Sequence, residues 1–425
     1  MKKKKAPLGR RMKEFVKTSV VWGPLDHNLF FTIIFLNVYG IIMVYSASYN
    51  NSITKNYSYF MNNQLKNVIF GFVIMIVASY VNYHRIVRFG WGWFWLLAAV
   101  AIIAALKTPL AHSELGATRW IKLGPVSFQA AEPIKAAIII FFAYYVSYWG
   151  LNRWYNQLLA CLLAIALLGF LFFFSNNLST VIVLFCICAV IILSSVKKPD
   201  LYWYFLLGLA LIIIAAIFVT VYLLMHQGAE NFRFVRIRAW LHPEEYAADE
   251  GLQAMQARYA IGAGGFWGKG LGQSLIKFKL SYSYNDFILA IICEELGVFG
   301  VIVMMTLFGY LLYRIYKIAQ NAWDIEGKVL AIGVFTQIAL QLLINVMVVT
   351  SVIPTTGVTL PFFSAGGTSV VFLLAELGMV LNVDKYAKER RFFEEAERHV
   401  AQMEQRGGIG AAGWRRRLDS ARTRR

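Results

Sequence analysis

Long uninterrupted apolar runs dominate the chain, separated by shorter polar or charged stretches. A helix needs about 20 mostly apolar residues to cross a hydrocarbon core of roughly 30 Å. Ten runs approach or exceed that length, at approximately residues 28–46, 67–82, 91–106, 131–149, 157–174, 179–195, 201–225, 284–312, 327–349 and 368–383. Because the runs are continuously apolar rather than alternating, they predict helices and exclude a transmembrane β-barrel. We therefore expect an all-α, polytopic membrane protein with about ten transmembrane helices.

The composition agrees with this class, since 59% of the 425 residues are hydrophobic and only 15% are charged. We divide the chain into a basic N-terminal tail (1–27), a membrane domain (28–383) and a basic C-terminal tail (384–425). The membrane domain contains one large loop (226–283) between the seventh and eighth spans. Neither an internal repeat nor a soluble domain long enough to fold alone is visible.

The net charge of +18 gathers at the two ends of the chain. Lys and Arg collect on the cytoplasmic flanks of transmembrane helices, so both tails are expected in the cytoplasm, as an even number of spans requires. The short loops "YHRIVR", "SSVKKPD" and "YRIYK" then fall on the same side. The basic runs lack a folded scaffold, so we interpret them as topology signals attracted to anionic lipid and expect no nucleic acid as a partner.

Three segments stand out on the predicted outer side, at 107–130, 226–283 and 350–367. The large loop carries seven basic residues despite lying outside: Arg233, Arg236, Arg238, Arg258, Lys269, Lys277 and Lys279. It is either a solvated loop balanced by its own acidic residues or a site for an anionic substrate such as a lipid diphosphate. Arginine favours the second reading because its guanidinium can hold phosphate oxygens bidentately.

Two glycine-rich stretches resemble known site motifs but do not match them. "GAGGFWGKGLGQS" (Gly262–Ser274) is not a phosphate-binding Walker loop, because Gly270 follows Lys269 where Ser or Thr is needed. It can form a tight re-entrant bend or close backbone N–H groups around a phosphate. "FFSAGG" likewise fails the nucleophile-elbow pattern, and we expect an unwound stretch that opens the last span beside a cavity.

Ionisable residues at membrane depth are the sharper clue, because they are costly there. Glu132 and Lys135 can pair across one helical turn; Glu294, Glu295 and Glu376 lie inside other spans. Each can be a structural ion pair or packing residue, but together they indicate a polar cavity that opens outward. Asp286 stands at the mouth of the eighth span, where it is either a catalyst or, through Ser283-x-x-Asp286, part of a helix-capping box.

Several stretches resemble the SEDS family of FtsW, RodA and SpoVE. They are "MVYSAS" (Met43–Ser48), "ATRWIKLGPVSFQAAEPIK" (Ala117–Lys135), "GFWGKGLGQS" (Gly265–Ser274), "NDFILAIICEELG" (Asn285–Gly297) and "VIPTTGVTLPFFSAGGTS" (Val352–Ser369). They occur in the family's order across nearly the whole chain, and "PTTGVTLPFFSAGGTS" is more similar to FtsW than to RodA.

The resemblance implies a peptidoglycan glycosyltransferase that polymerises lipid II at the outer face of the bacterial plasma membrane and releases undecaprenyl diphosphate. The family's carboxylate stretch, "PEAHTDF", aligns with "SYSYNDF" and gives Asp286 the role of catalytic base. The remaining candidates are Arg119, Lys135, Glu132 and Lys269 for the diphosphate, Ser364, Gly366 and Gly367 for the cavity, and Trp120, Glu294 and Glu295 in support.

The chain departs from the family pattern around these residues. Tyr284 replaces a His and Asn285 a Thr, while "QAAE" and "SNNLST" stand where "QPSE" and "QPDLGT" are common. The Asp is kept, so the departures bear on its surroundings rather than on the reaction.

The resemblance also implies partners and leaves rivals. A class B penicillin-binding transpeptidase and other membrane proteins of the division septum are the expected protein partners. Mg²⁺ or Mn²⁺ could assist the diphosphate, but no protein ligand cluster demands a metal. The alternatives are a lipid II flippase, which also suits intramembrane carboxylates, and a non-catalytic scaffold of the divisome.

Overall fold

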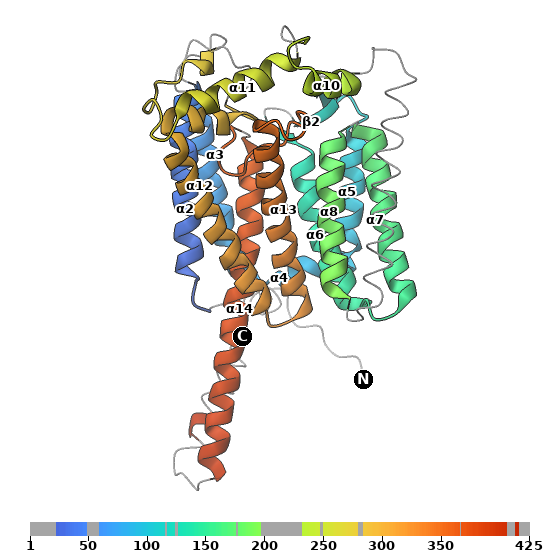
Figure 1. The fold of residues 1–425 in the computed structure, drawn as a ribbon. Helices are drawn as coiled ribbons and strands as arrows, with labels where there is room; N and C mark the ends of the chain where they lie inside the picture. Colours follow the sequence, from blue (N-terminus) through green and yellow to red (C-terminus); the bar gives the residue numbers. More distant parts are fainter. Residues whose placement is uncertain are drawn as a thin grey trace.

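The computed structural model is a bundle of membrane-length helices with a small cap at one end (Figure 1). It describes residues 23–48, 59–114, 117–123, 126–175, 177–196, 232–246, 250–278, 284–365, 367–405 and 413–415. The bundle contains α2 (His27–Ser48), α3 (Tyr59–Tyr80), α5 (Trp93–Ala105), α6 (Ala131–Tyr148), α7 (Trp154–Ser175), α8 (Leu178–Ser195), α12 (Ile288–Gln320), α13 (Ile325–Val349) and α14 (Thr368–Gln405).

Each of these helices corresponds to one predicted span. The remaining predicted span, 201–225, lies outside the described residues. Within the described part, six helices are both long and apolar enough to cross a membrane, and α5 is a shorter apolar helix. The prediction of a helical multi-pass membrane protein is therefore confirmed. Several boundaries differ. Helix α3 begins at Tyr59 rather than at 67, α12 runs from Ile288 to Gln320 rather than from 284 to 312, and α14 runs on to Gln405, into the region expected to be the tail.

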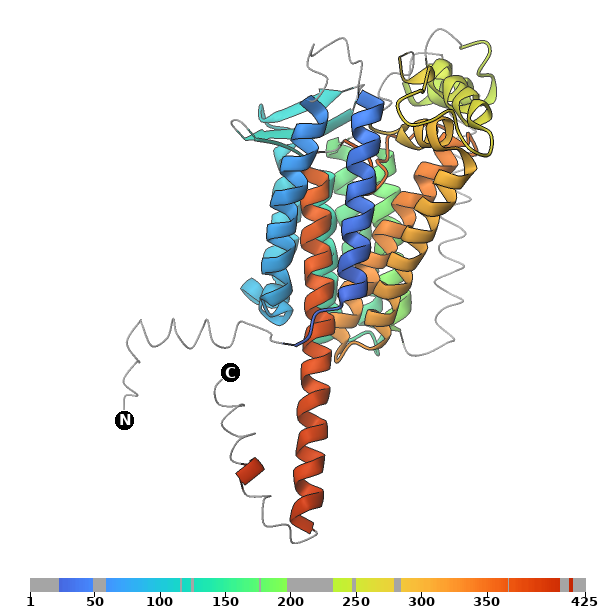
Figure 2. The same cartoon turned by 90° about the vertical axis from the view of Figure 1, so that its left-hand side faces the viewer.

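One end of the bundle, here named the loop end, carries a sheet that the apolar pattern did not predict. Strands β1 (Ala111–Glu114), β2 (Ala117–Leu123) and β3 (Val126–Gln129) pair antiparallel in the order β1-β2-β3. Helices α10 (Phe232–Leu241) and α11 (Glu250–Gly264) lie at the same end (Figures 1 and 2). At the opposite end, the tail end, α2 begins and α14 leaves the bundle as a projecting helix.

The glycine-rich segment packs as a tight bend against a kink in α12. Gly297 has non-helical backbone angles (φ 65°, ψ −163°), and Gly268 lies so close that a Cβ on it would stand 2.2 Å from the carbonyl oxygen of Glu295. Gly268 and Gly270 also have positive φ, which glycine adopts without strain. The N–H groups of Lys269 and Gly270 donate to the carbonyls of Glu294 and Glu295, both at 2.9 Å. Of the two sequence interpretations, the structure has the re-entrant bend.

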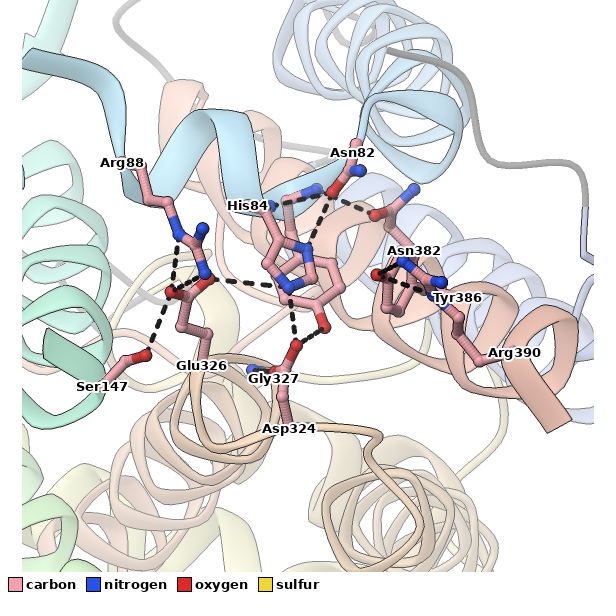
Figure 3. Close-up of polar contacts among 11 residues, drawn as sticks. Asn82, His84, Arg88, Ser147, Asp324, Glu326, Gly327, Asn382, Tyr386 and Arg390 are labelled. Atoms are coloured by element: carbon pink, nitrogen blue, oxygen red, sulfur yellow. Dashed lines mark hydrogen bonds and ion pairs between the residues drawn. The ribbon is translucent and has the colours of Figure 1, made fainter. Parts of the chain in front are cut away.

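A polar network joins three elements at the tail end (Figure 3). His84, on α4 (Tyr83–Val87), lies 2.6 Å from Asp324, whose side chain caps α13 by accepting from the N–H of Gly327. Burial opposes ionisation of Asp324, but His84 and that N–H outweigh it and lower the pKa of Asp324. Arg88 pairs with Glu326 at 2.8 Å. The network fixes the α3–α5 connection to the beginning of α13.

Candidate functional site

Asp286 lies in the turn before α12, at the loop end. Side chains from other parts of the chain bind the backbone carbonyls of this turn. The side chain of Asn345, on α13, donates to the carbonyl oxygens of Asp286 and Val358, both at 2.9 Å. Ser364 donates to the carbonyl oxygen of Asn285 at 2.9 Å. The N-cap position of α12 is Phe287, with no side-chain cap, so Asp286 does not cap this helix. Ser283, the other member of the predicted capping box, lies outside the described residues.

Two arginines from different elements share the surroundings of this carboxylate. Burial raises the pKa of Asp286, while the positive charges of Arg119 and Arg236 act against that rise. Arg119 comes from β2 and Arg236 from α10. A partly buried carboxylate with a raised pKa is suited to accept a proton, and two guanidiniums nearby are suited to hold an anion. The arrangement therefore suits proton transfer by Asp286 next to an anion held by Arg119 and Arg236.

The sheet positions Arg119 at the rim of a hollow. Its neighbour Trp120 is in register with His112 on β1 and Gln129 on β3, which places β2 in the centre of the sheet. The guanidinium of Arg119 also lies against Gly357, where a Cβ would stand 2.6 Å from Nη1. Arg119, Gln129, Asn177 and Thr180 line a hollow between the sheet, α6 and α8. A side chain at 357 would displace the guanidinium, and Gly357 also has φ 72°, which glycine adopts without strain.

A second hollow reaches Glu132 and Lys135 from the same side. It has about 350 Å³ of empty space, including solvent-open space, and shares Gln129, Asn177 and Thr180 with the first. Lys135 Nζ lies 2.9 Å from Glu132 Oε1, and both side chains are almost fully buried on α6. The segment Gly357–Thr359 and Gln341 complete the walls. Arg119, Glu132 and Lys135 therefore face two adjoining hollows, as the predicted polar cavity requires.

Three of the predicted residues are placed elsewhere, in a clamp on the glycine-rich segment. Lys269 Nζ lies 2.7 Å from Glu294 Oε1, and Ser274 donates to the same carboxylate. Glu295 accepts from Ser46 on α2 and from Lys277, whose Nζ lies 3.3 Å away. Lys269 is therefore engaged in an ion pair rather than in the two hollows. Glu294 and Glu295 fasten the segment from Lys269 to Lys277 to α12, and their supporting role at the site stays a prediction.

Of the remaining predicted residues, Ser364 contacts the turn that contains Asp286. Ser364 is buried, and its hydroxyl accepts from the N–H of Leu360 at 2.7 Å. Because the same hydroxyl donates to the carbonyl oxygen of Asn285, it ties the Asp286 turn to residues 360–364. Gly367 has φ 54°, as expected where an unwound stretch enters a helix. Gly366 lies outside the described residues. Among the residues that the structure describes, no three His, Cys, Asp or Glu side chains gather to hold a metal ion.

Two contributors were not singled out from the sequence. Arg236 appeared only as one of the seven basic residues of the large loop, and nothing in its local pattern separated it from Arg233 or Arg238. Asn345 sits in an apolar span, where a lone amide is costly unless it is hydrogen-bonded. A buried Asn at membrane depth was therefore a signal that could have been followed.

Comparison with known proteins shows which family the chain is similar to. Residues 26–389 match the family model of FtsW, RodA and SpoVE, described as a cell cycle protein. The "Probable peptidoglycan glycosyltransferase FtsW" of Trichlorobacter lovleyi is 31% identical over 382 residues, covering 88% of this chain and 96% of that protein. The "Stage V sporulation protein E" of Bacillus subtilis is 33% identical over 370 residues, covering 84% and 96%.

Solved structures share the fold at lower identity. A chain from the structure titled "Structural coordination of polymerization and crosslinking by a peptidoglycan synthase complex" gives a TM-score of 0.71 at 22% identity, covering 86% of this chain and 99% of that one. The rod shape determining protein RodA of Thermus thermophilus gives 0.61, also at 22% identity, covering 86% and 98%. These likenesses support the arrangement of the helices.

Proposed function

This chain belongs to the FtsW, RodA and SpoVE family of cell cycle proteins, and from that premise we propose that it is a peptidoglycan glycosyltransferase. Its substrate is lipid II, its product is a glycan strand, and undecaprenyl diphosphate is released. The observation that carries the proposal is the position of Asp286, which shares its surroundings with Arg119 and Arg236 beside hollows that reach Lys135. Relatives named as probable peptidoglycan glycosyltransferases support the same reaction.

In the reaction we propose, the 4-hydroxyl oxygen of the acceptor's GlcNAc attacks C1 of the donor's MurNAc. Asp286 takes the hydroxyl proton as the new C–O bond forms. The bond from C1 to the diphosphate oxygen breaks, and its electron pair leaves with undecaprenyl diphosphate. Arg119, Arg236 and Lys135 stabilise the negative charge that develops on the leaving group. Glu132 orients Lys135, and Asn345 with Ser364 keeps the Asp286 turn in place.

The orientation in the membrane follows from the same proposal. The loop end, which carries Asp286, faces the outside of the plasma membrane, where lipid II is polymerised. The tail end, where α2 begins and α14 leaves the bundle (Figure 2), then faces the cytoplasm with both basic tails. We place the protein at the division septum, with a class B penicillin-binding transpeptidase as its partner alongside other divisome membrane proteins. The solved peptidoglycan synthase complex of the same fold supports such a partner.

One reconstitution separates this proposal from its rivals. Purified protein is placed in vesicles with fluorescent lipid II, and both chain growth and transbilayer distribution are followed. Formation of polymer supports the glycosyltransferase. Equilibration of lipid II between leaflets without polymer supports a flippase, for which the buried charges on α6 and α14 would be the reason. Neither outcome supports a scaffold. Chelation of Mg²⁺ and Mn²⁺ in the same assay tests whether a divalent cation assists the diphosphate.

A further inference from the structure

Glu376 is a buried carboxyl group for which the proposed reaction has no role. It lies in the part of α14 that is packed inside the bundle, with its residue only 1% exposed. Gln337, on α13, donates to its Oε2 at 2.7 Å. No described residue makes a hydrogen bond with the second oxygen, Oε1, and the carbonyl oxygen of Gln337 is also without one. A carboxylate held by one neutral donor is poorly compensated at this depth.

The charges around Glu376 do not balance if all of them are ionised. Lys135 and Glu132, both on α6, are the charged groups that act on it, and they already neutralise one another at 2.9 Å. The other helices packed against this part of α14 carry their charges toward their ends: Lys66 on α3 is exposed, and Glu326 and Lys328 lie in the first turn of α13. On α12, Glu294 and Glu295 are engaged at the loop end, and Arg314 pairs with Asp26. A third ionised group beside a neutral pair leaves a net negative charge in the bundle.

Gln337 is a partner that fits Glu376 with or without a proton. A half-turn of its amide exchanges the NH₂ and the carbonyl oxygen. The NH₂ donates to an ionised Glu376, and the carbonyl oxygen accepts from a protonated one at the same distance. The hydrogen bond therefore survives a change of protonation without any movement of α13 or α14.

Lys135 connects this carboxyl group to the substrate. Its ammonium favours the ionised form of Glu376. Although its side chain is almost fully buried, it lies in the wall of the second hollow, from which an anionic ligand would approach it. When a diphosphate pairs with Lys135, it cancels the field that favours ionisation and adds negative charge nearby. The protonated form of Glu376 is then favoured over the ionised form.

We propose that Glu376 is a positioning residue that takes up one proton when the lipid diphosphate engages Lys135, so that substrate binding and protonation of this buried carboxyl are linked. The inference rests on the proposed function, since it uses the same ligand. Its consequence is that the diphosphate binds more tightly as the pH falls, because a proton is taken up on binding. Where a full proton is linked, the affinity changes by about tenfold per pH unit.

The test measures binding of undecaprenyl diphosphate to the purified full-length protein in nanodiscs from about pH 5 to about pH 9, the range in which buried carboxyl groups can titrate. The Glu376→Gln variant imitates the protonated form. We expect it to bind at high pH as tightly as the wild type binds at low pH, with a dependence reduced to the titration of the ligand itself. Lys135→Gln should bind weakly and flatten the same pH dependence, because the cation that couples the two groups is gone.

Glu326→Gln is the matched control, since Glu326 is an equally buried carboxylate that pairs with Arg88 at the tail end. It should keep the wild-type pH dependence. Calorimetry in two buffers of different ionisation enthalpy counts the protons taken up on binding by the wild type and by Glu376→Gln. Equal proton uptake by both proteins overturns the inference and leaves the glycosyltransferase intact. Failure of every folded protein to bind the diphosphate at any pH contradicts the ligand of the proposed function instead.

Discussion

At the scale of single residues, the account depends on a carboxylate that would be an ordinary acid in water and is made into a base by its surroundings. Burial raises the pKa of Asp286, and Arg119 and Arg236 limit the rise. A general base works best with a pKa near the operating pH. In the proposed reaction the two arginines have a second function, which is to hold the leaving diphosphate.

Replacing Arg119 should change the pH dependence of the reaction, because Arg119 acts on the pKa of Asp286. Arg119→Ala removes a positive charge that opposes the rise, so the pKa of Asp286 increases further and Asp286 stays protonated to higher pH. The acid limb of the pH profile of kcat/KM should move to higher pH, and turnover at neutral pH should fall. Arg119→Lys keeps the charge and should shift the limb less, with only partial recovery because a point charge replaces a planar fork. A profile in which neither substitution moves the acid limb contradicts the assignment.

Asn345 should prove to be a positioning residue. Asn345→Ala removes the donor to the carbonyl oxygens of Asp286 and Val358, and misplacement of a catalytic group by about 1 Å can cost around 100-fold in rate. We expect a large fall in kcat with little change in KM. Asn156→Ala is the matched control, since Asn156 also donates to two backbone carbonyls, those of Trp149 and Gly150, at the tail end. A similar loss in both variants would indicate general instability instead.

The sequence singled out Asp286 and Arg119 largely through the family resemblance, and Glu132 and Lys135 because charged residues within apolar runs are conspicuous; their roles stay predictions. It did not show that Lys269, which is just as charged, pairs with Glu294 after the bend of the glycine-rich segment. It also gave no reason to prefer Arg236 among the basic residues of its loop. Which charged residues converge depends on how the loops fold back, and that information is not local.

At the scale of elements, the apolar pattern was sufficient for the bundle and insufficient for its cap. A transmembrane helix is recognisable in the sequence by its length and hydrophobicity, so each of the nine described helices of the bundle was predicted. The sheet β1–β3 is built from short strands with mixed side chains, and its strands are stabilised by pairing with one another. The beginning of α12 shifted from the predicted residue because Tyr284–Phe287 are held as a turn by α13 and by Ser364 and Ala365.

The clamp formed by Glu294 and Glu295 should control the order of the glycine-rich segment. Glu294→Ala leaves Lys269 and Ser274 without their carboxylate. Loss of one partner of a fully buried ion pair costs about 3–5 kcal/mol, and the cost here is smaller because the Lys269 side chain is 32% exposed. We expect faster hydrogen exchange in residues 265–278 and weaker activity, while the tail end keeps its protection. Glu326→Ala should do the reverse, loosening the tail end and leaving this segment unchanged. Unaltered exchange in residues 265–278 of Glu294→Ala would show that the clamp is dispensable.

At the scale of the whole molecule, the two ends of the bundle differ in kind. The loop end gathers Asp286, the sheet and the two hollows, whereas the tail end is fixed by the network of His84, Asp324 and Glu326 (Figure 3). An enzyme acting on a lipid-linked sugar needs this asymmetry, because the carrier lies in one leaflet and the sugar projects from it. The proposed reaction therefore places the loop end on the outer side of the membrane.

Cysteine labelling tests that orientation. On a background without the four native cysteines, single cysteines replace Trp267, which is 76% exposed at the loop end, and Arg85 in the "YHRIVR" loop. A membrane-impermeant maleimide should label position 267 in intact cells and position 85 only after lysis. The opposite pattern would place the site in the cytoplasm, where the proposed reaction does not occur.

The central claim is that Asp286 accepts the proton of the attacking hydroxyl, and Asp286→Asn tests it most directly. The amide keeps the shape and hydrogen-bonding capacity of the side chain but cannot take that proton. Loss of a general base costs about 10²–10⁴ in rate, so the purified, folded variant should bind lipid II normally and make almost no glycan polymer. The measurement is the initial rate of polymer formation from fluorescent lipid II, alongside its binding. Polymerisation by Asp286→Asn at a near wild-type rate would contradict the account.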